Sequence, residues 1–162
     1  MIARGPVLFA ATALLFAAPL AARPAAPHTP AVGSAERTAI IQTLRWHPEA
    51  RFTFRHLRVW QDGKRGIAYA EGDNGLIGDF KIILTRDGQA DWRQVWGEGA
   101  GGSDSCVAGA RHYGWAINLI RSYHVAPDAL FPGITKQTRE MERMAKSDPD
   151  LQCVGDLDGG PA

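Results

Sequence analysis

Residues 52–96 read FTFRHLRVW, QDGKR, GIAYAEG, DNGLIGD, FKIILT, RDGQA and DWRQVW, and this stretch decides the fold. Four short runs rich in aromatic and β-branched residues are separated by segments that contain Asp-Gly or Asn-Gly. Aromatic and β-branched residues favour strands, and these dipeptides supply the positive φ angles of tight hairpin turns. The stretch therefore predicts a four-stranded antiparallel meander.

The first run of the meander changes parity. Phe52 and Phe54 alternate with polar residues, but the next apolar residue is Leu57, whereas regular alternation would place it at position 56. Side chains along a strand alternate between the two faces, so a change of parity indicates an extra residue. We therefore expect a β-bulge near Arg55-His56.

Helices are expected before and after the meander. An N-terminal helix fits SAERTAIIQTLRW, with Ser34 as its N-cap, and the apolar spacing of residues 107–124 and, more weakly, of residues 134–146 predicts two more. A helix, a strand meander and then helices is the α+β pattern, with the helices packed on one side of an antiparallel sheet. A sheet of this kind with one helix laid across it is typical of cystatin-like and NTF2-like architectures.

Three segments together carry a resemblance: SAERTAIIQTLR, HLRV in the first strand, and GWAINLIRSYHVAPDALFP towards the end. They make residues 34–132 similar to small exported proteins of proteobacteria that have no assigned activity. The resemblance implies an exported protein of cystatin-like or NTF2-like architecture and transfers no catalytic residue. This chain departs from that pattern in its Cys-containing Gly-rich loop and in its C-terminal helix and tail.

The N-terminal 22 residues have the pattern of a signal peptide. One basic residue, Arg4, precedes a continuous apolar run over residues 7–18, and small residues follow the run. The run is too short for a membrane-spanning helix, which needs about 20 apolar residues. We expect a signal peptide over residues 1–22 and no stable membrane insertion after its cleavage, which places the mature protein in the periplasm or outside the cell.

The rest of the chain divides into three parts. Residues 23–33 form a Pro/Ala-rich spacer, residues 34–146 a single α+β domain, and residues 147–162 an Asp/Gly-rich tail. Removing Arg4 takes the formal net charge from +1 to zero. Nucleic-acid affinity depends largely on clustered Lys and Arg, so we expect no nucleic-acid partner.

Cys106 and Cys153 are the only two cysteines. In an exported chain an even number of cysteines favours a disulfide over reactive thiols. The bond would tie the tail back to the second helix, closing a loop of about 47 residues and contributing about 4 kcal/mol in the chain-entropy treatment. A thiolate at a helix N-terminus is the alternative, but neither cysteine belongs to a C-x-x-C motif.

No catalytic constellation is assembled in the sequence. Ser105 and His112 could share a helix face, but there is no G-x-S-x-G motif, and capping is the simpler role for this serine. The histidines lack metal-ligand spacing, and no motif indicates a cofactor. We therefore expect binding rather than catalysis.

Two functional hypotheses remain. The first is a non-catalytic binding module of the cell envelope that recognises a protein or a glycan through Trp92, Gln94 and Trp96, which alternation places on one face of the last strand. Burial of these tryptophans in the core is its alternative. The second is an NTF2-like small-ligand pocket between the first helix and the sheet, with His56, Tyr69 and Asp79 as its polar groups. A pocket with convergent polar groups would favour the second hypothesis, and an exposed tryptophan patch the first.

Overall fold

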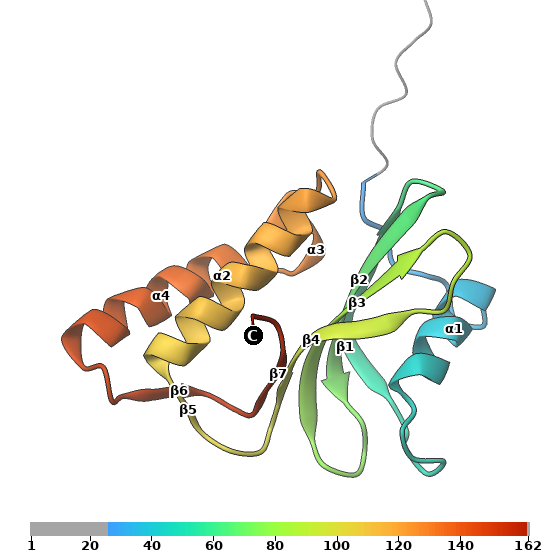
Figure 1. Cartoon of the computed structure of the whole chain (residues 1–162). Helices are drawn as coiled ribbons and strands as arrows, with labels where there is room; N and C mark the ends of the chain where they lie inside the picture. Colours follow the sequence, from blue (N-terminus) through green and yellow to red (C-terminus); the bar gives the residue numbers. More distant parts are fainter. Residues whose placement is uncertain (1–25, 162) are drawn as a thin grey trace, which may run out of the picture.

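The computed structural model describes residues 26–161 and contains the predicted meander of four antiparallel strands (Figure 1). The α+β class and the antiparallel meander are confirmed. The predicted signal peptide, residues 1–22, lies outside the described residues. The strands of the meander are β1 (Thr53–Gln61), β2 (Arg65–Asp73), β3 (Asp79–Asp87) and β4 (Arg93–Gly99).

Each hairpin turn of the meander contains an Asp or Asn followed by glycine. In the turn between β2 and β3, the buried Asn74 side chain accepts hydrogen bonds of 2.9 Å from the backbone N–H groups of Leu76 and Ile77. Gly75 has a φ of 74°, a conformation that glycine adopts without steric cost. This local chemistry fixes the register of β2 against β3.

The predicted bulge in β1 is confirmed. The register of β1 against β2 shifts between Phe54 and His56, so Arg55 is an extra residue opposite β2. The Arg55 side chain reaches back to the backbone carbonyl of Gly72 at 3.5 Å. The bulge therefore holds a guanidinium group at the end of the sheet.

A second bulge lies in β4, where the sequence predicts none. The β3 partners of Gln94 and Trp96 are adjacent in sequence, so Val95 is an extra residue. Trp96 consequently packs in the core on one face of the sheet, whereas Trp92 packs in the core on the other face. The prediction that Trp92 and Trp96 share a face is wrong, because the bulge reverses the alternation between them.

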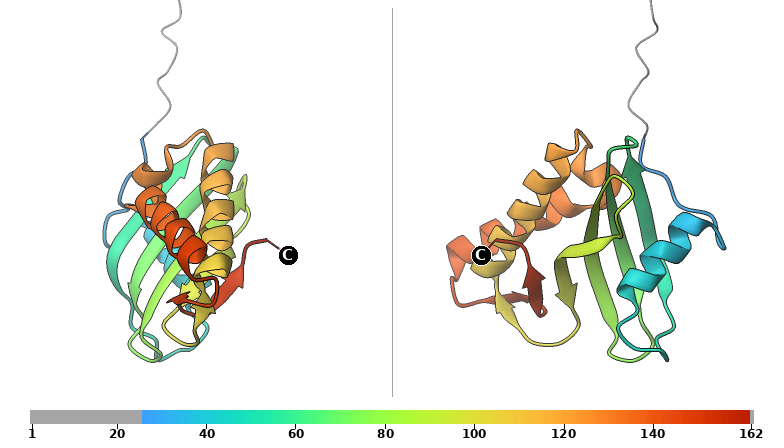
Figure 2. Two further views of the ribbon diagram at one scale, coloured as in Figure 1. Left: turned by 90° about the vertical axis from the view of Figure 1, so that its left-hand side faces the viewer. Right: turned by 45° about the vertical axis from the view of Figure 1, so that its right-hand side comes forward.

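Helices cover both faces of the sheet (Figures 1 and 2). The N-terminal helix packs on the face opposite to the C-terminal helices, whereas the sequence led us to expect all helices on one side. The reason lies in β2, where Ile67 and Tyr69 are buried on one face and Ala68 and Ala70 on the other. The helices are α1 (Ala35–Leu44) on one face and α2 (Cys106–Ser122), α3 (Pro127–Leu130) and α4 (Ile134–Ser147) on the other.

The C-terminal tail forms strands, although its composition favours an irregular, mobile segment. β6 (Gln152–Val154) pairs with the short β5 (Asp104–Ser105), and β7 (Leu157–Gly159) pairs with β4. The meander thereby becomes a five-stranded sheet in the order β1-β2-β3-β4-β7. We call residues 148–161 the C-terminal strap, which crosses the edge of β4 (Figure 2).

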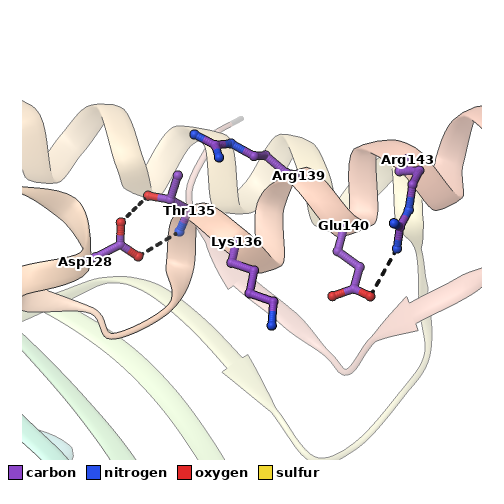
Figure 3. Close-up of a pocket in the computed structure, with 6 residues that line it drawn as sticks. All are labelled: Asp128, Thr135, Lys136, Arg139, Glu140 and Arg143. Carbon is purple, nitrogen blue, oxygen red and sulfur yellow. Dashed lines mark hydrogen bonds and ion pairs between the residues drawn. The ribbon is translucent and has the colours of Figure 1, made fainter.

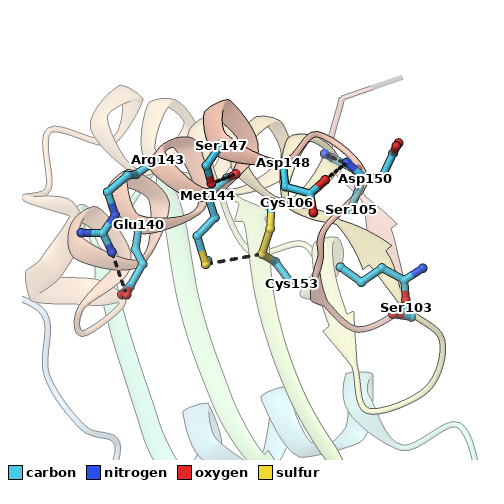
Figure 4. The surroundings of a disulfide bond; sticks show 12 residues. Ser103, Ser105, Cys106, Glu140, Arg143, Met144, Ser147, Asp148, Asp150 and Cys153 are labelled. Carbon is cyan, nitrogen blue, oxygen red and sulfur yellow. Dashed lines mark hydrogen bonds and ion pairs between the residues drawn. A yellow bond between two sulfur atoms is a disulfide. The ribbon is translucent and has the colours of Figure 1, made fainter.

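The cysteines anchor this strap. Cys106 is the first residue of α2 and Cys153 lies in β6, with their Cα atoms 4.8 Å apart and their sulfur atoms at disulfide-bonding distance (Figure 4). The Cys106 backbone N–H also donates to the Leu151 carbonyl at 2.7 Å. The pairing expected from the sequence therefore joins the strap to the start of α2.

The segment before α1 covers part of the outer edge of β1. His28 and Val59 exchange two backbone hydrogen bonds of 2.8 Å. An uncovered edge strand presents unpaired N–H and C=O groups to other chains, so this bridge protects part of the edge.

Candidate functional site

A pocket with charged walls lies at the end of the sheet where β3 begins and β4 ends. Its volume is about 280 Å³. One wall is the C-terminal strap, and the others come from the β1 bulge and from the two strands. We call it the charged pocket; its lining residues are Arg55, Asp79, Phe80, Lys81, Glu98, Gly99, Ala100 and Gly155.

The β-sheet register builds this site by placing polar residues side by side. On adjacent strands, His56 lies opposite Glu71, Glu71 opposite Lys81, and Lys81 opposite Glu98. Directly opposed side chains in an antiparallel sheet are close enough to interact. We call these four residues the charged row; it runs across β1, β2, β3 and β4.

Lys81 and Glu98 form the centre of the row. The Lys81 Nζ lies 3.1 Å from a carboxylate oxygen of Glu98, and the two side chains are only 24% and 12% exposed. Both contact Tyr113 of α2: Lys81 donates to its hydroxyl at 2.9 Å, and the same hydroxyl donates to Glu98. The amide of Gln137 on α4 also donates to Tyr113, at 3.2 Å. The ion pair is therefore held from the sheet and from two helices.

Arg55 forms a second ionic group beside the pocket. Its guanidinium donates to Asp79 at 2.9 Å and to Glu71 at 3.3 Å. The hydrogen bond from Arg55 lowers the pKa of the exposed Asp79 carboxyl. Glu71 also accepts a hydrogen bond of 2.7 Å from the buried Tyr69 hydroxyl. The pocket therefore has cationic and anionic groups on more than one wall.

The two tyrosines of the site are held in their neutral form. Burial raises the pKa of Tyr113, and the neighbouring Glu98 carboxylate raises it further. Burial also raises the pKa of Tyr69, and its hydrogen bond to Glu71 adds to the effect. A neutral phenol can donate to a carboxylate, whereas a phenolate beside one would be repelled.

These pKa values predict loss of stability in alkali. Above about pH 10 the unfolded chain loses its tyrosine protons, whereas Tyr69 and Tyr113 keep theirs in the folded state because burial raises their pKa values. The folded state then binds more protons, so the free energy of unfolding should fall by about 1.4 kcal/mol per pH unit for each tyrosine. Urea unfolding at several alkaline pH values would measure this slope. Tyr113→Phe should reduce the size of this slope by about 1.4 kcal/mol per pH unit. An unchanged slope in that variant would contradict the raised pKa of Tyr113.

The residues predicted for a small-ligand pocket lie at or near this site. Asp79 lines the charged pocket, Tyr69 connects to it through Glu71, and His56 belongs to the charged row. Their expected position under the first helix is wrong, because Tyr69 faces the C-terminal helices and stacks on Phe131 with ring centroids 3.9 Å apart.

The sequence reasoning missed the central residues of the site: Lys81, Glu98 and Tyr113. The sequence did not predict the pairing of these strand residues. In the structure Glu71 and Lys81 are each five residues from Leu76, the middle of the turn, whereas a two-residue hairpin at Asn74-Gly75 would place Glu71 opposite Gly78. The contact with α2 had no signal either, because it depends on how the helix packs.

The surface site expected at the tryptophans is not assembled. Trp92 is 4% exposed and Trp96 is fully buried. Gln94 is exposed, and its side-chain amide donates to Asp158 at 2.6 Å. It lines a different hollow, on the α1 face of the sheet, that is also lined by another tryptophan, Trp46.

Ser105 and His112 both have structural roles. The Ser105 hydroxyl accepts from the Ala108 backbone N–H and caps α2. The His112 ring bonds to the Gly97 carbonyl at 2.9 Å, and burial lowers its pKa. Within residues 26–161 no hydrogen bond joins the serine to the histidine, so this pair forms no nucleophile–base arrangement there.

A larger hollow of about 680 Å³ lies over α3 and α4 (Figure 3). Its lining side chains are of both charge signs: Asp128 binds Thr135, and Glu140 pairs with Arg143 at 3.3 Å, whereas Lys136 and Arg139 form no ion pair within the described residues. Exposed pairs of this kind contribute little energy and are easily rearranged. We therefore place the candidate site at the charged pocket, where the Lys81–Glu98 ion pair is largely buried.

No group of three or more His, Cys, Asp or Glu side chains in the described residues is arranged to hold a metal ion. None of the helices in the same residues has the length and apolar character needed to cross a membrane. Comparison with known protein families, with curated proteins and with solved structures finds no match to this chain.

Proposed function

We propose that this chain is an exported, non-catalytic binding protein and that its ligand site is the charged pocket. The observation that carries the proposal is the Lys81–Glu98 pair, which is largely buried and yet lines a hollow. Burying an ion pair removes both charges from water, and its stabilisation of a fold is often small. Partly buried ionic groups beside a cavity are therefore better explained by ligand recognition than by stability.

The charges of the pocket suggest the class of ligand. Its lining residues include two cations, Arg55 and Lys81, and two carboxylates, Asp79 and Glu98. A ligand with a single charge would be attracted by the two wall groups of opposite sign and repelled by the two of like sign. A small zwitterion, with a carboxylate and an ammonium group, can satisfy both. We propose an amino acid or a short peptide as the ligand class.

Binding without catalysis is supported by the roles of the reactive side chains. Ser105 and His112 are engaged in capping and in a buried hydrogen bond. The raised pKa values of Tyr69 and Tyr113 keep these phenols protonated near neutral pH, so neither supplies a phenolate as a base. In the proposal these tyrosines position the carboxylates of the row.

Export is supported by the N-terminal sequence and by the cysteines. Residues 1–22 have the charged, apolar and small-residue order of a signal peptide. Sulfur atoms at disulfide-bonding distance fit an oxidising compartment, where such bonds persist. We propose the periplasm or the cell exterior as the location.

Three matched probes test the ligand class. L-leucine is a zwitterion, 4-methylpentanoate has the same side chain without the ammonium group, and 3-methylbutylamine has it without the carboxylate. We expect L-leucine to shift the backbone amide NMR signals of Gly99, Ala100 and Gly155, which line the pocket. Each single-charge analogue should bind about tenfold more weakly, because it leaves one pair of wall charges unmatched.

Variants separate the pocket from general effects. Lys81→Gln and Glu98→Gln should each weaken L-leucine binding about tenfold. Lys136→Gln removes an exposed lysine on α4 and should change nothing. Equal binding of the three probes would overturn the zwitterion assignment, and no amide shift with any of them would overturn the proposed pocket.

A further inference from the structure

A second hollow, of about 310 Å³, lies on the α1 face of the sheet. Its floor belongs to the apolar core under α1, whereas Lys81 points to the opposite face. Its walls come from the end of α1, from the β2–β3 turn and from the strap. We call it the apolar groove; the apolar residues that line it are Leu44, Trp46, Phe52, Ile77, Phe80 and Ile82.

The groove is open beside Gly99 on β4, which has no side chain, whereas at Gly97 the Gln94 amide nitrogen lies 2.9 Å from where a Cβ atom would be. Trp96 faces the C-terminal helices, so Gly97 and Gly99 face the other way, towards α1. A Cβ atom added at Gly99 would meet only Asp156, at 4.0 Å. The helix itself ends at Leu44 and leaves this end of the sheet uncovered.

Large apolar side chains are exposed around the opening. Trp46 is 61% exposed, Ile77 65% and Leu76 43%. Trp46 and Ile77 both line the groove, and Leu76 is next to Ile77 in the turn. Single exposed apolar residues are ordinary, but several around one hollow indicate an interaction site.

The polar rim of the groove is acidic. Asp156 and Asp158 belong to the strap, and Gln94 donates to Asp158 at 2.6 Å. Among the described residues that line the groove there is no Lys or Arg. The rim therefore favours an occupant that is neutral or positively charged.

We propose that the apolar groove docks a protein partner that inserts one aromatic or aliphatic side chain next to a Lys or Arg. The inserted side chain would pack between Trp46 and the phenylalanines of the floor, and the basic residue would face Asp156 and Asp158. Tryptophan is enriched in the energetic centres of protein interfaces. The exposed side chains of Ile77 and Leu76 cannot form hydrogen bonds with the hydroxyl groups of a sugar, so the observations favour a protein over a glycan. The groove and the charged pocket share Phe80, Glu98 and Gly99 in their linings, but this proposal does not depend on the ligand proposed for the charged pocket.

Peptide titrations followed by NMR test the inference. The probe is N-acetyl-Lys-Phe-Lys-amide, and its counterpart is N-acetyl-Glu-Phe-Glu-amide; chitotriose serves as the saccharide. The basic peptide should shift the indole N–H signal of Trp46 and the amide signals of Gly97 and Gln94. The acidic peptide should bind roughly threefold more weakly, which is the size expected for charges on an exposed rim.

Matched variants locate the binding. Trp46→Ala should weaken the basic peptide about tenfold, as removal of a central tryptophan does. Val107→Ala removes an exposed apolar side chain on α2 and should leave binding unchanged. Arg55→Gln should also leave it unchanged, because Arg55 lines the charged pocket and does not line the groove. Equal binding of the acidic peptide, shifts with chitotriose alone, or no loss in Trp46→Ala would overturn the inference.

Discussion

Trp96→Ala should lower the free energy of unfolding by about 4 kcal/mol, within the range found when a buried tryptophan or phenylalanine is truncated. Trp96 is fully buried, and its ring stacks on His112 and meets Tyr113 edge-on, with centroid distances of 4.8 and 5.1 Å. Its indole N–H donates to the His112 carbonyl at 3.1 Å, so the truncation also removes a buried hydrogen bond. Urea unfolding monitored by circular dichroism would measure the change.

Trp46→Ala is the matched control for this variant. Its side chain is 61% exposed, and a surface substitution of this kind should change stability by no more than about 0.5 kcal/mol. A comparable loss in both variants would contradict the placement of Trp96 in the core.

A second comparison separates hydrogen bonding from packing. Trp96→Phe removes the N–H that donates to His112, whereas the buried indole N–H of Trp92 has no partner among the described residues. Trp96→Phe should therefore cost about 1 kcal/mol more than Trp92→Phe. The two residues were indistinguishable in the sequence, so this difference tests the bulge that places them on opposite faces.

The two bulges show what alternation can and cannot reveal. In β1 the apolar residues on either side of Arg55 are out of phase, so the extra residue is visible in the sequence. In β4 the run from Trp92 to Trp96 alternates without a break, and Val95 is compatible with either face. A bulge at a residue that fits both faces leaves no periodic signal.

The candidate site could be predicted only in part for a similar reason. His56, Tyr69 and Asp79 were named as the polar groups of a pocket under the first helix, and they lie at or near the charged pocket. The ion pair of Lys81 and Glu98 required the register of β3 against β4, and Tyr113 required the packing angle of α2. Local composition defines strands and turns, but contacts between distant segments follow from packing, which composition does not specify.

The strands of the tail have no signal in its composition, because composition does not include pairing partners. Residues 147–162 are rich in Asp, Gly and Pro, which are depleted in strands. β4 supplies a free edge, and Gly99 donates to the Asp156 carbonyl at 2.9 Å while Gly160 donates to the Val95 carbonyl at 2.9 Å. Strand formation in the tail is therefore imposed by the sheet, with the cysteines holding the segment in reach.

Replacing Cys106 and Cys153 together by serine should have an effect as large as that of Trp96→Ala. The two residues are 47 positions apart, and removing a cross-link over a loop of this length costs about 4 kcal/mol in the chain-entropy treatment. Cys106 is fully buried, so a serine hydroxyl there adds a polar group to an apolar site. The comparison of urea midpoints between the serine variant and the oxidised wild type would measure the loss.

Which part of the structure loses stability tests the role of the cross-link more sharply than the size of the loss does. Without the cross-link, β6 and β7 are held mainly by short backbone pairings, so the amide protons of Asp156 and Gly160 should exchange with solvent much faster. Amide protons in the β2–β3 hairpin should still exchange only through global unfolding, because the hydrogen bonds between β2 and β3 do not involve the strap. The Gly155 backbone N–H, which donates to Glu98 at 3.4 Å, would be released as well. Loss of the cross-link should therefore open the charged pocket on its strap side and weaken L-leucine binding. Uniform acceleration of exchange across the sheet would instead mean that the strap and the meander unfold as one unit.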